Sequence, residues 1–107
     1  MAQLNKGEYG QLVYANLGED VSSGTDLKMV LEPQVGKVLN RLAGDGVAVG
    51  TVNVTVGDVI FLANQYLQYT ILSGDLNYVG NWRLKGEVNI SSTNKVVSDY
   101  RQFEVRA

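Results

Sequence analysis

The side chains that most often carry enzyme chemistry are missing from this chain or fall in expected turns. The 107 residues include no histidine and no cysteine, which removes the commonest general base, the thiol nucleophile and the usual zinc ligands. A carboxylate pair could still hydrolyse a glycosidic bond. In expected turns, however, aspartate usually bonds to nearby backbone, and five acidic residues lie there: Glu19, Asp20, Asp45, Asp58 and Asp75. The sequence therefore favours a non-enzymatic protein and indicates no catalytic residue.

Binding sites for phosphate, metal and nucleic acid also lack support in the sequence. The glycine-rich residues 44–50 lack the Lys-Ser/Thr ending of a phosphate loop, and no helix is expected after them. Asp45 and Asp58 do not belong to a D-x-D-x-D calcium pattern. The nine basic residues are scattered and are outnumbered by eleven acidic ones, whereas phosphate contacts need clustered cations. We expect no cofactor, no resident metal and no nucleic-acid partner.

The six tyrosines offer a different chemistry, because an exposed aromatic ring can stack on a sugar. Tyrosine is also an ordinary strand residue, so burial in a sheet is the simpler interpretation. Tyr66 and Tyr69 differ in strand parity and cannot both face the core unless a bulge intervenes. One of them is expected to be exposed. Together with Tyr78, they are the candidate contact residues.

The elements that would position these side chains are strands. Apolar and polar residues alternate along residues 26–32 and 81–90, the period at which side chains face opposite sides of a sheet. In the second segment the apolar side chains are expected to face inward and the polar ones, of mixed charge, to face solvent. The inward set is Trp82, Leu84, Val88 and Ile90, and the outward set is Arg83, Lys85, Glu87 and Asn89.

Turn residues recur roughly every ten positions and no segment shows a clear helical stripe, which predicts an all-β sandwich of about seven to eight antiparallel strands. The expected strands are residues 11–17, 26–32, 37–42, 47–56, 59–63, 66–72, 81–90 and 95–105. Residues 9–107 would form one domain. Residues 1–8 are expected to form an N-terminal arm that is too polar to belong to the core, so that deleting residues 1–6 would leave the melting temperature nearly unchanged.

One local pattern favours an immunoglobulin-like sandwich. Asp75 is followed by Gly80 and then by the aromatic Trp82 at the start of a long strand, which is similar to the corner where such a chain crosses between its sheets. We name Asp75, Gly80 and Trp82 the corner residues. The buried indole N–H of Trp82 is expected to need a carbonyl partner.

Several motifs, in this order, resemble those of the immunoglobulin-like N-terminal module of phage baseplate upper proteins. They are Lys-Gly-Glu at residues 6–8, a Ser-Ser-Gly-Thr-Asp-Leu loop ending at Leu27, Pro-Gln-Val-Gly at residues 33–36, and the Asp-Leu-x-x-x-Gly-x-Trp run at residues 75–82. The closing Phe-Glu-Val at residues 103–105 also fits. Residues 47–56 form a longer segment than this module has.

The resemblance implies an immunoglobulin-like fold and a structural role in a tailed-phage virion. The partners would be other virion proteins of the tail, baseplate or neck, with self-association in a symmetric assembly as a further option. Residues 1–8 lack the pattern of a secretory signal, and the longest apolar run is residues 59–63, so we expect a soluble protein made in the host cytoplasm, with no membrane partner. A carbohydrate-binding or adhesion-type module, or a capsid decoration protein, are the alternatives.

Overall fold

The computed structural model describes residues 3–107, which form an all-β sandwich, as predicted. Its strands are β1 (Gln3–Asn5), β2 (Leu12–Asn16), β3 (Thr25–Pro33), β4 (Leu39–Leu42), β5 (Ala48–Val49), β6 (Val54–Val56), β7 (Val59–Phe61), β8 (Tyr66–Thr70), β9 (Gly80–Ser91), β10 (Asn94–Val97) and β11 (Arg101–Arg106). One turn of 3-10 helix, Ala43–Asp45, lies between β4 and β5.

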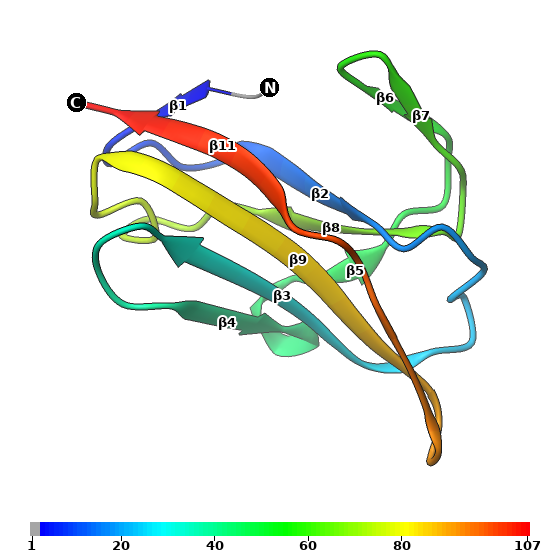
Figure 1. Cartoon of the computed structure of the whole chain (residues 1–107). Helices are drawn as coiled ribbons and strands as arrows, with labels where there is room; N and C mark the ends of the chain where they lie inside the picture. Colours follow the sequence, from blue (N-terminus) through cyan, green and yellow to red (C-terminus); the bar gives the residue numbers. More distant parts are fainter. Residues whose placement is uncertain (1–2) are drawn as a thin grey trace.

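Two sheets face each other and carry most of these strands (Figure 1). The large sheet has the order β1-β11-β9-β3-β4, with β10 paired to the far part of β9, and the small sheet has the order β2-β8-β5. The pairing of β1 with β11 is parallel, and the others are antiparallel. This is the strand order of immunoglobulin-like sandwiches, with the β6–β7 hairpin added between β5 and β8.

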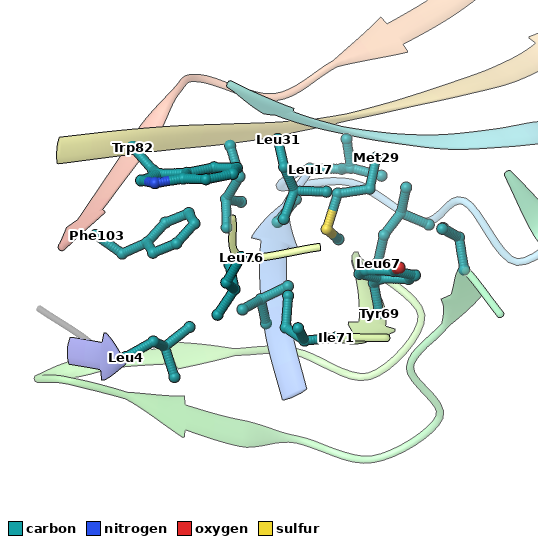
Figure 2. Packing of buried hydrophobic residues seen from close by; sticks show 14 of the residues in the cluster. Leu4, Leu17, Met29, Leu31, Leu67, Tyr69, Ile71, Leu76, Trp82 and Phe103 are labelled. Carbon is teal, nitrogen blue, oxygen red and sulfur yellow. The ribbon is translucent and has the colours of Figure 1, made fainter. Parts of the chain in front are cut away.

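The core lies between the two sheets and takes alternate side chains from each strand. Along β9, Trp82, Leu84 and Val88 are buried, whereas Arg83 is exposed, as the alternation predicts. Leu67 of β8 enters the same cluster from the small sheet, and Figure 2 shows this apolar packing. The long strand of the sequence pattern is therefore the central strand of the large sheet.

The N-terminal residues differ from the expectation that they form an arm outside the core. Strand β1 pairs with Glu104–Arg106 of β11, and its Leu4 is only 7% exposed. Leu4 belongs to the core cluster, on the side where Figure 2 places Phe103. The free edge of β11 supplies backbone partners for a short polar strand, so that one leucine suffices to anchor it. The prediction that this segment is too polar for the core is wrong at Leu4, and residues 1–2 lie outside the described part of the chain.

The segment 47–56 does not form one strand as predicted but divides into β5 and β6. Between them the chain passes directly over the side chain of Tyr66. A Cβ added at Gly50 would lie 1.9 Å from the Tyr66 ring, so only glycine permits this close approach. The path over the ring takes the chain out of the small sheet after Val49.

The predicted strand 95–105 is likewise divided, into β10 and β11, at residues 98–100. Both halves pair with β9. At the break, the Ser98 N–H donates to the Gly86 carbonyl at 2.9 Å, and the Ser98 Oγ accepts from the Gly86 N–H at 2.8 Å. The side chain of Ser98 thus replaces a backbone acceptor where the ladder is interrupted.

Candidate functional site

The corner predicted from the sequence contains a buried polar network. Residues 71–79 carry the chain from β8 in the small sheet to β9 in the large sheet. The Asp75 side chain, 2% exposed, forms an ion pair with Arg41 of β4. It also accepts hydrogen bonds from the Tyr69 hydroxyl and, at 2.9 Å, from the Leu72 N–H. The aspartate expected in a turn therefore connects β4, β8 and the crossing segment.

Gly80 and Trp82 complete the corner. Gly80 has a φ of +126°, a backbone conformation that favours glycine. The Trp82 indole N–H donates to the Tyr78 carbonyl at 2.9 Å, which is the carbonyl partner expected from the sequence. The centre of the Trp82 ring lies 5.8 Å from that of the Phe103 ring in β11. Asp75 and Trp82 are thus held by contacts within the chain.

The protonation states of Tyr69 and Arg41 in this network are those that stabilise the fold, not those of groups that exchange protons near neutral pH. Burial, followed by the hydrogen bond to Asp75, raises the pKa of Tyr69 far above the usual value of tyrosine. Burial opposes the charge of Arg41, but the hydrogen bond and charge of Asp75 outweigh it, and the pKa of Arg41 is raised. At neutral pH the Tyr69 phenol is therefore protonated and Arg41 is charged, which is what their bonds to Asp75 require.

Two of the candidate contact residues, Tyr66 and Tyr69, are fully buried, so the prediction that one of them is exposed is wrong. Tyr69 faces the core. Tyr66 lies outside that cluster, and the chain around the β6–β7 hairpin covers it. Its hydroxyl donates to the Val52 carbonyl at 2.7 Å, and its ring centre lies 6.2 Å from that of Phe61. A second layer outside the small sheet buries the tyrosine that strand parity directs away from the core.

Tyr78, the third candidate contact residue, is partly exposed. Its ring lies over Gly36, where an added Cβ would come within 2.6 Å of ring carbons. The sequence neighbours Val35 and Val79 are also exposed. These residues form a small apolar surface at the corner end of the sandwich, and Tyr78 remains a candidate contact residue.

Sequence reasoning missed a second apolar surface, on the β6–β7 hairpin. Val59 is 53% exposed and Ile60 is 60% exposed, and Val52 and Leu62 beside the hairpin are also exposed. Among the described strands β6 and β7 pair only with each other, and Figure 1 shows the hairpin standing apart from the two sheets. The sequence places Asp58 in an expected turn between residues 47–56 and 59–63, but a local pattern cannot show that no sheet covers either strand.

The outer face of the large sheet carries mixed charges, as predicted. Arg83 pairs with Glu32 at 2.8 Å, and Glu87 pairs with Lys95 at 3.1 Å. The partly exposed Tyr100 lies against this face, with the Arg83 guanidinium carbon 3.9 Å from its ring centre. A cation already covers that face of the ring, so Tyr100 is a poor platform for a sugar.

Other kinds of site find no geometric support in the described part of the chain. Among residues 3–107, no three His, Cys, Asp or Glu side chains gather as metal ligands would. The same residues include no helical segment with the length and hydrophobicity needed to cross a bilayer. Comparison with family models, curated proteins and solved structures gives no match. The exposed surfaces described above are therefore the features of the molecule that bear on its function.

Proposed function

We propose that this chain is a non-enzymatic structural component of a bacteriophage virion, in the tail, baseplate or neck, and that it acts through protein–protein contacts. The observation that carries the proposal is the exposed apolar surface of the β6–β7 hairpin, at Val59 and Ile60. Val59 and Ile60 are successive residues of β7 and so lie on opposite faces of the hairpin. Exposed apolar side chains concentrated on one small element are typical of surfaces that become buried in a complex. The ordered motifs from residues 6–8 to residues 75–82, which resemble a phage baseplate module, support the virion setting.

The chemistry of the hairpin favours a protein partner over a sugar or a nucleic acid. Residues 52–62 include no Lys or Arg, one acidic residue (Asp58) and one aromatic residue (Phe61). Phe61 is buried, so no ring is free to stack on a sugar or base. Burying the exposed part of Val59 and of Ile60 would contribute about 1 kcal/mol each. Such a surface gains its affinity from apolar contact.

The test compares two valines of similar exposure. Val59 lies on β7, and Val97, 48% exposed, lies on β10, away from the hairpin. Val59→Lys and Val97→Lys add the same charge to exposed strand positions. Virions are purified from a culture of the phage whose genome encodes the chain. The amount of the chain in these virions is quantified by mass spectrometry. We expect both variants to melt near the wild-type temperature and Val97→Lys to enter particles normally. Val59→Lys should be reduced at least about tenfold, because the lost apolar contact of about 1 kcal/mol and the cost of burying the added charge together exceed about 1.4 kcal/mol.

Two outcomes would contradict different parts of the proposal. Normal incorporation of Val59→Lys would show that the hairpin is not the docking element. Absence of the wild-type chain from purified virions would exclude the virion role, and binding of the isolated chain to a glycan array would then favour the carbohydrate-binding alternative.

A further inference from the structure

One edge of the small sheet is open. Among the described strands, β2 pairs only with β8. The residues that flank β2, Gln11 and Leu17, form 2.8 Å backbone hydrogen bonds with residues that flank β8. Because the bonding side alternates along an antiparallel strand, odd-numbered residues of β2 face β8. The N–H and C=O groups of Leu12, Tyr14 and Asn16 therefore point away from β8, toward the open edge.

A groove runs beside this edge. It lies between β2 and β11, and the turn of the β6–β7 hairpin forms its third wall. Much of its lining is apolar and includes Leu12, Val56, Leu84 and Phe103. An extended chain lying in this groove would have the open edge of β2 along one side, where the Tyr14 carbonyl accepts a hydrogen bond from Arg101, and apolar side chains around it.

The groove also contains a cation, Arg101. Arg101 is on the inward face of β11, in alternation with the buried Phe103, and its guanidinium donates to the Tyr14 carbonyl at 3.2 Å. Its carbon lies 5.9 Å from the centre of the Phe61 ring. Within residues 3–107 none of the ion pairs includes Arg101, and burial lowers its pKa. A partly desolvated guanidinium without a carboxylate favours an anionic partner.

We propose that this groove binds an extended strand of a neighbouring subunit, which pairs with the open edge of β2 and places one carboxylate against Arg101. This is strand addition, in which backbone hydrogen bonds give affinity and alternate side chains give specificity. The strand's inward side chains would be apolar, to meet Leu84 and Phe103, with one Asp or Glu among them. The inference rests on the proposed function only for the source of the strand, because the groove itself determines its chemistry.

An inward-pointing charge at a sheet edge can have another role, since it discourages pairing between exposed edges. The two roles of Arg101 make different predictions. If Arg101 only prevents edge pairing, it disfavours any added strand, whatever the composition of that strand. A binding residue accepts a strand that carries a carboxylate and prefers it to the same strand without one.

The experiment uses the purified full chain and two eight-residue peptides with blocked ends, each long enough to cover the ~17 Å of a five-residue strand. The first is Thr-Val-Thr-Glu-Thr-Val-Thr-Val, and the second has Gln in place of Glu. We expect the Glu peptide to bind at least about tenfold more tightly, as a charge-assisted hydrogen bond predicts. Arg101→Gln should abolish this preference. Arg83→Gln, which removes a cation from the outer face of the same sheet, should retain it.

Amide exchange measured by NMR identifies the mode of binding. Strand addition slows exchange at Leu12, Tyr14 and Asn16, and leaves Val13 and Ala15, which already face β8, unchanged. Equal affinity of the two peptides, no binding at millimolar concentration, or slowed exchange that does not follow this alternation would each overturn the proposal. The peptide experiment uses no phage component, so a negative result would not contradict docking by the hairpin or the virion role. A negative result in the particle experiment would likewise not contradict strand binding in the groove.

Discussion

The corner at residues 71–82 and the hairpin at residues 52–62 both connect strands, yet the corner buries its key side chains and the hairpin exposes them. The corner buries Asp75 and Trp82 and provides hydrogen-bond partners for both. The hairpin leaves Val59 and Ile60 exposed. A segment that crosses between sheets must satisfy the polar groups it takes into the core. The hairpin lies outside that core, so its outer side chains are free to serve a partner.

The hairpin is nevertheless anchored to the small sheet. Phe61 is buried beside Tyr66, and the Tyr66 hydroxyl donates a hydrogen bond to the Val52 carbonyl. These contacts, together with the hydrogen bond from the Ala63 N–H to the Asn53 Oδ1 at 2.8 Å, fix the base of the hairpin. The comparison predicts large losses of stability when a large apolar side chain is truncated at the corner end of the core, smaller losses at this anchor, and little change at the exposed hairpin positions.

The largest effect is expected for Trp82→Ala, which should lower the free energy of unfolding by about 3 to 5 kcal/mol because it leaves a cavity beside Phe103. Chemical denaturation measures this change. Trp82→Phe is the control, since it keeps an aromatic ring there and loses the hydrogen bond to Tyr78, and it should cost less. A loss below about 1 kcal/mol for Trp82→Ala would contradict the structural role of the corner.

Leu4→Ala should cost about 3 kcal/mol, as other buried leucines do. Leu4 packs in the core and β1 pairs with β11, so deleting residues 1–6 should lower the melting temperature, contrary to the expectation from the sequence. Lys6→Ala, at an exposed position, is the control and should be neutral. If thermal melting shows no loss for Leu4→Ala, β1 does not contribute to the fold in solution.

Gly50→Ala tests the anchor of the hairpin and should cost about 2 kcal/mol, because the added methyl group overlaps the Tyr66 ring. The ring must move, and the hairpin base with it. Gly44→Ala adds a methyl group where no atom lies within 4 Å and serves as the matched control. Equal stability of the two variants in urea would show that the path over Tyr66 is not fixed.

A smaller effect, about 1.5 kcal/mol at neutral pH, is expected for Tyr69→Phe, which removes a hydrogen bond to a charged acceptor. The raised pKa of Tyr69 also predicts a pH dependence. Its contribution is complete below the unfolded-state pKa of about 10 and is lost as pH rises above that value, because the unfolded chain then releases a proton that the folded chain keeps.

Denaturation between pH 8 and pH 11 measures this dependence. The stability difference between wild type and Tyr69→Phe should shrink above pH 10. Tyr9→Phe, at an exposed position, should keep the wild-type profile. A constant difference between wild type and Tyr69→Phe over this range would mean that Tyr69 is not held protonated by the fold.

The parts of the fold that depend on local pattern were predictable from the sequence. The alternation at residues 81–90 placed Trp82 in the core and Arg83 outside, and the Asp75, Gly80 and Trp82 spacing located the corner. What the sequence could not show depends on distant partners. The burial of Leu4 requires the edge of β11, about a hundred positions away along the chain.

The same limit applies to the candidate site. Strand parity separated Tyr66 from Tyr69 correctly but could not show that a hairpin outside the small sheet covers Tyr66. The ion pair between Arg41 and Asp75 joins residues 34 positions apart. The corner pattern located Asp75, but no local signal pairs it with Arg41. The groove beside Arg101 is likewise formed by three elements that meet only in the fold.

The central claim, that the β6–β7 hairpin docks on a partner while the corner maintains the fold, is tested most directly by hydrogen–deuterium exchange of the isolated chain and of the chain in the assembled particle. The account predicts that residues 52–62 gain protection on assembly and that residues 80–91, already protected, change little. Protection gained only around residues 35–38 and 78–79, at the opposite apolar surface, would contradict it.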